Sequence, residues 1–409
     1  MKEWKTYKLS EIADIQTGPF GSQLHNNDYV DKGTPIVTVE HLGNRKFSTQ
    51  NLPCVSDEDK ARLAKYVLEK GDIVFSRVGS VDRCSYVSSD EDGWMFSGRC
   101  LRVRCNNMCN PLFLYYYFCK ETIKQYIRSV AVGATMPSIN TKLLSDLPII
   151  LPSRKIQDKV AHILARLDDK IELNRQINDN LEQQAQALYK SWFVDFEPFK
   201  EGEFIESELG LIPSTWRTTS LLKMINVMNG GTPKTNEDKY WNGKIPFFTP
   251  KDNDSSIYCH STEKHITELG LSKCNSLLYP KDTIFVTARG TVGKICLSGT
   301  AMAMNQSCYA IVANDSSQQL FWYYTISNLI RVIKNKANGA VFDAITVKDF
   351  DEVIVIPDNP TINSFVQRVS AMFESINNNL LENISLAKQR DTLLPKLMSG
   401  ELKINEIDC

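Results

Sequence analysis

One stretch of this chain, residues 160–192, recurs 205 positions later as residues 365–397. Within each copy, apolar and asparagine positions alternate in steps of four and three, which is the spacing of a coiled-coil seam. The seam positions are Val160, Leu164, Leu167, Ile171, Asn174, Asn178, Leu181, Leu188 and Trp192 in the first copy, and Phe365, Val369, Met372, Ile376, Asn379, Asn383, Leu386, Leu393 and Leu397 in the second. The sequence therefore predicts two long helices of similar design.

A weaker repeat precedes each helix. The shared signals, first-half members before second-half ones, are an opening tryptophan (Trp4; Trp216), a glycine-rich break (18–21; 230–233), two strand-like runs (35–39 and 71–77; 245–249 and 282–289) and a later helix (from Asn110 through Ile123; from Gln319). Two globular units, each followed by a long helix, indicate a molecule with an internal pseudo-two-fold axis.

The predicted fold class is α+β, with two α/β globular units related by the pseudo-two-fold axis and separated by two long antiparallel coiled-coil helices. The expected domains are 1–152 for the first unit, 153–200 for the central helix and the start of a linker, 201–357 for the rest of the linker and the second unit, and 358–409 for the distal helix and tail. Residues 196–213 lose helical periodicity, which indicates a linker.

The two helices are expected to pack on each other, because each 33-residue stripe, about 50 Å long, must be buried. An antiparallel arrangement pairs Asn174 with Asn383 and Asn178 with Asn379, and seam asparagines fix register. An alternative is that these amides only border solvent. Tyr189, Trp192 and Phe193 add apolar surface near one end, which favours a further protein partner.

Composition restricts the class of protein only broadly. The 409 residues are 42% hydrophobic, enough for folded cores, and the formal net charge of -1 requires any basic surface to be local. Eleven cysteines without a leader segment are typical of reduced thiols, and no apolar run approaches the ~20 residues of a membrane span. A soluble cytoplasmic protein without membrane association is expected.

Several motifs together resemble the specificity (S) subunits of type I restriction-modification enzymes. They are LDDKIELNRQIN (167–178) and ALYKSWF (187–193) in the first helix, RDTLLPKLMSGEL (390–402) in the second, and GTPK (231–234) and GATMPSIN (133–140) in the globular units. The resemblance covers essentially the whole chain, and the combination is more specific than any single motif.

The resemblance implies two target-recognition domains, each reading one half of a bipartite sequence in double-stranded DNA, with the helices setting the spacing. It also implies that two methyltransferase (M) subunits dock on the helices and that restriction (R) subunits join for cleavage. The chain itself is then non-catalytic and without cofactor, and S-adenosylmethionine, together with ATP and Mg, is expected on the partner subunits. Independently, a rod of about 50 Å corresponds to roughly 15 base pairs, enough to separate two half-sites.

Candidate DNA contacts are basic and amide side chains near glycine-broken turns, because Arg and Lys suit phosphate and guanine while Asn and Gln suit adenine. The candidates are Arg77, Arg83, Arg99, Lys251, Arg289, Lys294, Asn305 and Gln306. Arg77 and Arg289 are interpreted as matched positions. The alternative for each basic residue is a solvated surface charge or a structural pair; Arg102 and Arg104 fit the solvent face of a strand better.

Other motifs have simpler interpretations. Asn110-Pro111-Leu112-Phe113 resembles the adenine-binding loop of amino-methyltransferases, but proline in a first helical turn explains it better. The cysteines at 100, 105 and 109, and the group Cys259, His260, His265 and Cys274, lack the spacing of metal ligands. Residues 290–294 lack the full P-loop pattern. Two other classes stay open as alternatives: a coiled-coil scaffold for protein partners, and an enzyme acting alone.

Overall fold

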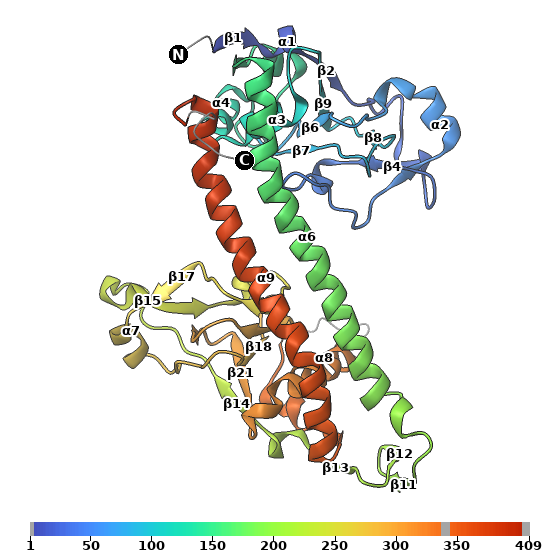
Figure 1. Ribbon diagram of the computed structural model, residues 1–409, viewed down its shortest axis with the longest axis vertical. Coiled ribbons are helices and arrows are strands. Elements are labelled where there is room, and N and C mark those ends of the chain that lie inside the picture. Colours follow the sequence, from blue (N-terminus) through green and yellow to red (C-terminus); the bar gives the residue numbers. More distant parts are fainter. Residues whose placement is uncertain (1–3, 337–343, 403–409) are drawn as a thin grey trace. The chain divides into compact units, whose positions relative to one another are not determined.

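The computed structural model describes residues 4–336 and 344–402, and the chain divides into two compact units. The first unit comprises Met1–Lys170 and Leu386–Cys409, and the second comprises Ile171–Ser385. Each unit contains a globular lobe and part of each of two long helices (Figure 1). The expected α+β class, a two-fold repeat of mixed lobes with long helices, is confirmed.

Two sheets form the lobe of the first unit. Both have four strands. The one with the longer strands, called the larger sheet, is antiparallel with the order β2-β9-β6-β7, and the smaller sheet has the order β3-β5-β4-β8. Their strands are β2 (Ala13–Thr17), β9 (Cys100–Cys105), β6 (Ile73–Ser76), β7 (Cys84–Tyr86), β3 (Tyr29–Val30), β5 (Cys54–Val55), β4 (Thr34–Val37) and β8 (Met95–Phe96). All four residues of β6 are buried, as expected for the hydrophobic run predicted there.

Short helices and a two-stranded ladder complete this lobe. They are α1 (Leu9–Ile12), α2 (Asp57–Arg62), α3 (Pro111–Cys119), α4 (Glu121–Val130), α5 (Thr141–Ser145), and the antiparallel pair β1 (Lys5–Lys8) and β10 (Pro148–Leu151). The single helix predicted from Asn110 through Ile123 is in fact two, because the backbone is extended at Lys120. Asn110 caps α3 by accepting hydrogen bonds from the backbone N–H groups of Leu112 and Phe113, at 2.9 and 3.0 Å.

The second lobe repeats this plan. One sheet has the order β14-β21-β18-β19-β16 and another has β17-β15-β20. The elements are β14 (Ile225–Asn229), β21 (Cys308–Ala313), β18 (Ile284–Thr287), β19 (Ile295–Ser298), β16 (Tyr258–Cys259), β17 (Lys264–Ile266), β15 (Trp241–Phe248), β20 (Ala303–Met304), α7 (Glu268–Ser272), α8 (Gln319–Lys336), and the pair β13 (Arg217–Ser220) and β22 (Val353–Ile356).

The register of the ladders establishes which residues of the two lobes are equivalent. Ser76 at the end of β6 pairs with Cys100, and Thr287 at the end of β18 pairs with Cys308. Since strand ends and partners correspond, Ser76 is equivalent to Thr287. The repeat predicted from sequence is therefore a repeat of backbone structure.

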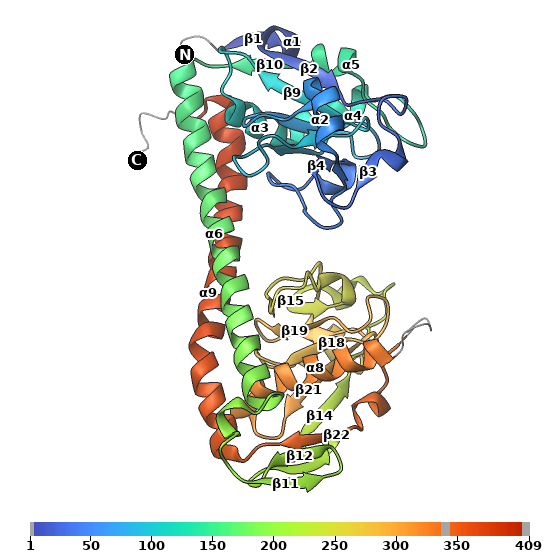
Figure 2. The same cartoon turned by 90° about the vertical axis from the view of Figure 1, so that its right-hand side faces the viewer.

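The long helices are α6 (Arg154–Phe193) and α9 (Asn359–Ser399), with 40 and 41 residues. Each is longer than the predicted 33 residues. The first helix, α6, begins directly after Ser153, whose carbonyl accepts the N–H groups of Ile156 and Gln157. In each unit the parts of α6 and α9 belonging to it lie side by side (Figures 1 and 2). All predicted seam residues are buried or half-buried.

Amide hydrogen bonds join the helices within the second unit. Asn174 Nδ2 donates to Asn383 Oδ1 at 2.9 Å, and Asn379 Nδ2 donates to Asn178 Oδ1 at 2.8 Å. Numbers rise on α6 as they fall on α9, so the two helices are antiparallel here. These are the pairs expected from sequence, and Asn174, at 0% exposure, does not border solvent.

A charged cluster joins the lobe of the first unit to both helices. Asp168 on α6 accepts hydrogen bonds from Tyr116 Oη and from Arg390 Nη1 on α9, both at 2.7 Å. Burial lowers the pKa of Arg390, but the hydrogen bond and charge of Asp168 outweigh it and leave that pKa raised. The adjacent Asp169 pairs with Arg45 of the lobe at 2.8 Å. Asp168 therefore ties three elements of one unit together.

One sequence interpretation is wrong at the end of α6. Tyr189, Trp192 and Phe193 do not form free apolar surface, because they pack in the core of the second unit, where Phe193 contacts Phe321 and Phe365 at ring distances of 5.0 and 5.1 Å. The predicted linker 196–213 contains an antiparallel hairpin of two strands, β11 (Phe204–Ser207) and β12 (Gly210–Pro213). Over the described residues, no helix combines the length and apolar character that crossing a membrane requires.

Candidate nucleic-acid interface

Three loops meet at one edge of the first lobe, where strands of the larger sheet end. They are residues 18–21 after β2, 77–83 after β6, and 97–99 before β9. The N–H of Arg77 donates to the carbonyl of Arg99 at 2.9 Å, and Arg77 Nη1 donates to the carbonyl of Gly98 at 3.2 Å. The tertiary structure therefore brings together Arg77 and Arg99, which are 22 residues apart in the sequence.

A glycine permits two of these loops to touch. A Cβ atom on Gly18 would lie 2.2 Å from the carbonyl oxygen of Ser97, closer than any real side chain can approach. In the second lobe, a Cβ on the equivalent Gly230 would lie 2.1 Å from the carbonyl oxygen of Asn305. Both lobes therefore use the same close backbone approach at this edge.

Basic side chains of the first lobe are available at this edge. Arg77 is half-buried, and its guanidinium lies 5.6 Å from the ring centroid of Phe20, itself an exposed aromatic residue. Arg83 and Arg99 are exposed, and neither has an ion-pair partner among the residues described. A cationic and aromatic surface of this kind suits phosphate groups and base faces.

The five candidates of the second lobe also lie on loops at the corresponding edge. Lys251 and Arg289 are exposed; Lys294 Nζ donates to the carbonyl of Asn253 at 2.9 Å. Asn305 Oδ1 accepts the N–H of Ser307, and Gln306 Oε1 accepts from the hydroxyl of Thr232. The amides of Asn305 and Gln306 therefore keep their NH₂ groups as donors.

Arg77 and Arg289 are not at equivalent positions. Because Ser76 is equivalent to Thr287, Arg77 corresponds to Ala288 and Arg289 to Val78. The backbone agrees, since Arg77 and Ala288 both donate to the carbonyl of the residue before the paired cysteine, at 2.9 and 2.8 Å. The two arginines look matched in the sequence because each comes after a buried strand and shortly before a glycine, but they are one residue out of register in the structure.

The interpretation of Arg102 and Arg104 as solvent-facing is also wrong. Arg102 is only 5% exposed and pairs with Asp14 at 2.7 Å. Arg104 pairs with Asp72 at 2.7 Å and with Glu69 at 2.6 Å. Residues 65–72 lie against this face of β9, where the carbonyls of Lys65 and Val67 accept hydrogen bonds from Arg102 and Arg104. The alternating arginines therefore form ion pairs and do not simply face solvent.

Two lysines gather beside the turn that follows β18. Lys334 Nζ on α8 donates to the carbonyl of Gly293 at 3.0 Å, next to Lys294. Burial and the charge of Lys294 lower the pKa of Lys334. In the first lobe the residue equivalent to Gly293 is Asp82, which neutralises Arg128 at 2.8 Å. The second lobe thus carries a concentration of positive charge suited to an anion.

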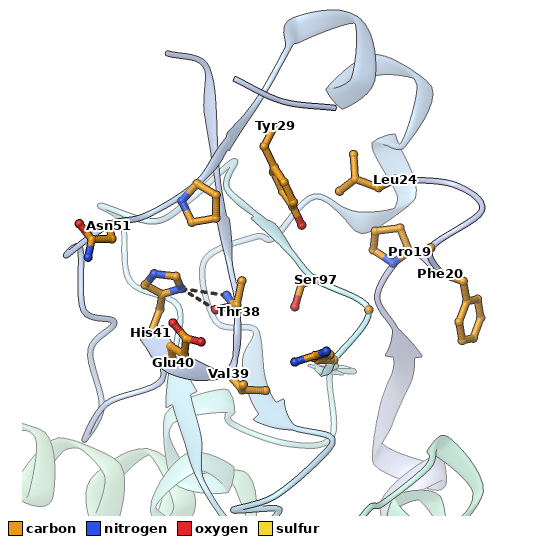
Figure 3. A pocket seen from close by; sticks show the side chains of 14 residues that line it. Pro19, Phe20, Leu24, Tyr29, Thr38, Val39, Glu40, His41, Asn51 and Ser97 are labelled. Atoms are coloured by element: carbon orange, nitrogen blue, oxygen red, sulfur yellow. Dashed lines mark hydrogen bonds between the residues drawn. The ribbon is translucent and has the colours of Figure 1, made fainter. Parts of the chain in front are cut away.

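The first lobe has a pocket of about 540 Å³ beside the converging loops (Figure 3). It is lined by Pro19, Phe20, Gly21, Leu24, Tyr29, Thr38, Val39, Glu40, His41, Asn51, Pro53, Ser97, Gly98 and Arg99. His41 Nδ1 accepts the N–H of Thr38 at 3.1 Å, which leaves the ring hydrogen on Nε2. Sequence reasoning missed Glu40 and His41, although the matched strands 35–39 and 245–249 could have indicated them.

The remaining motifs have structural explanations. Asn110 and Pro111 form the first turn of α3, as the sequence interpretation held. Burial raises the pKa of the Cys100 thiol to about 12 and that of Cys119 to about 11, which opposes thiolate chemistry. Within residues 4–336 and 344–402, no three His, Cys, Asp or Glu side chains are grouped as metal ligands would be.

Known proteins with similar sequences and folds bear on this interface. Residues 1–183 and 213–386 each match the family described as the type I restriction modification DNA specificity domain. The specificity subunit of the type I restriction enzyme HindI of Haemophilus influenzae is 25% identical, over 98% of this chain and 100% of its own. The MjaIX specificity subunit of Methanocaldococcus jannaschii is 27% identical, over 99% and 95%.

The fold is also similar to a solved structure. The crystal structure of a type I restriction-modification S subunit from M. genitalium superposes with a TM-score of 0.62 and 16% identity, covering 97% of this chain and 96% of that one. At this level of identity the likeness concerns the fold.

Proposed function

The chain belongs to the type I restriction-modification DNA specificity family, and we propose that it is the non-catalytic subunit that reads the DNA target of such an enzyme. Each lobe reads one half of a bipartite sequence, through the edge where its loops converge. The observation that supports this most is the repetition of that edge, with Gly18 and Gly230 in the same close backbone contact and exposed basic side chains beside each.

The same proposal assigns the long helices two tasks. They hold the lobes at the spacing of the two half-sites, and their outer faces bind two M subunits, with R subunits joining for cleavage. Exposed apolar residues on the part of the pair in the second unit support protein docking: Leu173, Ile177, Leu381 and Ile384. S-adenosylmethionine and ATP with Mg are then held by the partners.

DNA binding by the purified chain with its methyltransferase subunits is expected to weaken steeply as salt rises, because neutralised phosphates release counterions. Gel-shift titrations at increasing salt, on DNA that contains the target, measure this. Binding that is independent of salt would contradict the proposal. A scaffold without DNA recognition, the alternative class, predicts no sequence-dependent adenine methylation when the chain is added to M subunits and S-adenosylmethionine.

Arg77→Ala is expected to weaken use of the half-site read by the first lobe, and Arg289→Ala that of the second, each by about 1–3 kcal/mol if the arginine contacts a base. Each substitution removes a guanidinium that would contact DNA at the loop edge of one lobe, and the other lobe keeps all its contacts. Competition binding with DNA altered in one half-site measures the effect. Arg62→Ala is the matched control, since Arg62 pairs with Asp59 on α2; an equal loss there would remove the assignment.

A further inference from the structure

The two lobes present side chains of opposite charge at one equivalent position. In the first lobe this is Glu40, the middle residue of a short 3-10 turn (Val39–His41), and in the second it is Lys251, the middle residue of Pro250–Asp252. Both side chains are exposed. Throughout the described ranges, neither has a hydrogen-bond or ion-pair partner.

Backbone structure fixes the equivalence. The strands before the two turns each pair in parallel with a short strand, Val37 opposite Phe96 in one lobe and Phe248 opposite Met304 in the other. Both turns are then capped in the same way. The N–H of Thr38 donates to His41 at 3.1 Å, and that of Thr249 donates to Asp252 at 2.7 Å. Glu40 and Lys251 therefore occupy equivalent positions on the surfaces of their own lobes.

That point belongs to the loop edge in both lobes. Glu40 lines the same pocket as Phe20 and Arg99 (Figure 3). In the second lobe, the hydroxyl of Thr291, in the turn that follows β18, donates to the carbonyl of Pro250 at 3.5 Å, next to Lys251. An unpaired carboxylate here would be repelled by phosphate, so it cannot serve general affinity for DNA.

We infer that this position selects the base in each half-site, with Glu40 accepting a hydrogen bond from an exocyclic amino group and Lys251 donating to guanine. The inference rests on the function proposed above. An ionised carboxylate only accepts and suits cytosine N4, whereas an ammonium only donates and suits guanine O6 and N7. The wrong base places two acceptors together, or two donors, so each side chain rejects as well as selects.

An exchange of the two charges tests this. Glu40→Lys and Lys251→Glu are made singly in the full chain, which is purified with its methyltransferase subunits and used to select duplexes from a randomised library. Glu40→Lys is expected to change the preference at one base pair of the first half-site by about tenfold or more, from cytosine or adenine, whose amino groups lie in the major groove, to guanine. Lys251→Glu is expected to cause the reverse change in the second half-site only.

The controls keep the charge change and move it elsewhere. Glu58→Lys on α2 and Lys273→Glu, both at exposed positions, are expected to leave both half-sites unchanged. The unaltered half-site in each variant reports that the chain is folded, and Glu40→Gln, which both accepts and donates, is expected to relax the first preference.

The outcomes separate the two proposals. If the natural chain selects a bipartite sequence and Glu40→Lys selects the same one, the inference is overturned and the proposed function stands. Loss of both half-sites in Glu40→Lys also overturns it, because the effect is then not local. If the natural chain selects no sequence at all, the proposed function itself fails.

Discussion

Asp168→Ala is expected to destabilise the first unit by about 3 kcal/mol, the low end for removing one partner of a buried ion pair. The Asp168 side chain is 11% exposed and bridges Arg390 and Tyr116. Its loss leaves the half-buried Arg390 with only the exposed Asp391 as an ion-pair partner and leaves the buried Tyr116 hydroxyl without its acceptor. Hydrogen exchange of the full chain, resolved by peptide, measures the change. Exchange of α3 in the first unit should accelerate, while that of α8 in the second unit stays as it was.

The neighbouring Asp391→Ala is the matched control. Asp391 also pairs with Arg390, at 2.8 Å, but its side chain is 64% exposed. Exposed pairs contribute about 0–1 kcal/mol, so this variant should exchange almost as the natural chain does. Equal acceleration in both variants would show that the buried bridge has no special role.

Gly18→Ala is expected to abolish recognition by the first lobe while leaving the second half-site in use. The added Cβ would lie 2.2 Å from the carbonyl oxygen of Ser97, so the loops at 18–21 and 97–99 must separate. Overpacking of this kind destabilises by about 1–3 kcal/mol and moves the backbone that carries Arg99. Selection from a randomised DNA library reads each half-site separately.

Gly21→Ala, in the same loop, is the control, because no atom lies within 4 Å of its added Cβ. It should select the natural sequence. Gly230→Ala repeats the clash in the second lobe and should remove the other half-site instead. If Gly18→Ala keeps both half-sites, the loop contact does not position the reading surface.

The seam and its partner pairs were accessible to sequence reasoning because they are periodic. Asn174 and Asn383 lie at the spacing of the seam, and a pseudo-two-fold axis that crosses the midpoints of two equal antiparallel stripes pairs them. The prediction that Tyr189 forms a surface for a protein partner was wrong, because an amphipathic pattern shows that a face is buried but not which element covers it. The core of the second unit covers that face.

The candidate interface was predictable only as a set of residue types near glycines. Arg77 and Arg289 look matched in sequence, but the ladder register shifts them by one residue. Arg102 looks free in sequence, yet it forms an ion pair with Asp14 on the neighbouring strand β2. Such pairings depend on contacts between distant segments, which no local pattern encodes.

The sequence by itself determined the duplicated plan, the two helices and their asparagine pairs, because repetition and helical period are written directly in the order of residues. Only the tertiary structure decided which charges are neutralised inside the lobes and which remain available at the loop edge, with Glu40 and Lys251 at one shared position. The physical reason is that burial and ion pairing arise when strands from different parts of the chain are brought together, and the loops that connect those strands carry no period of their own.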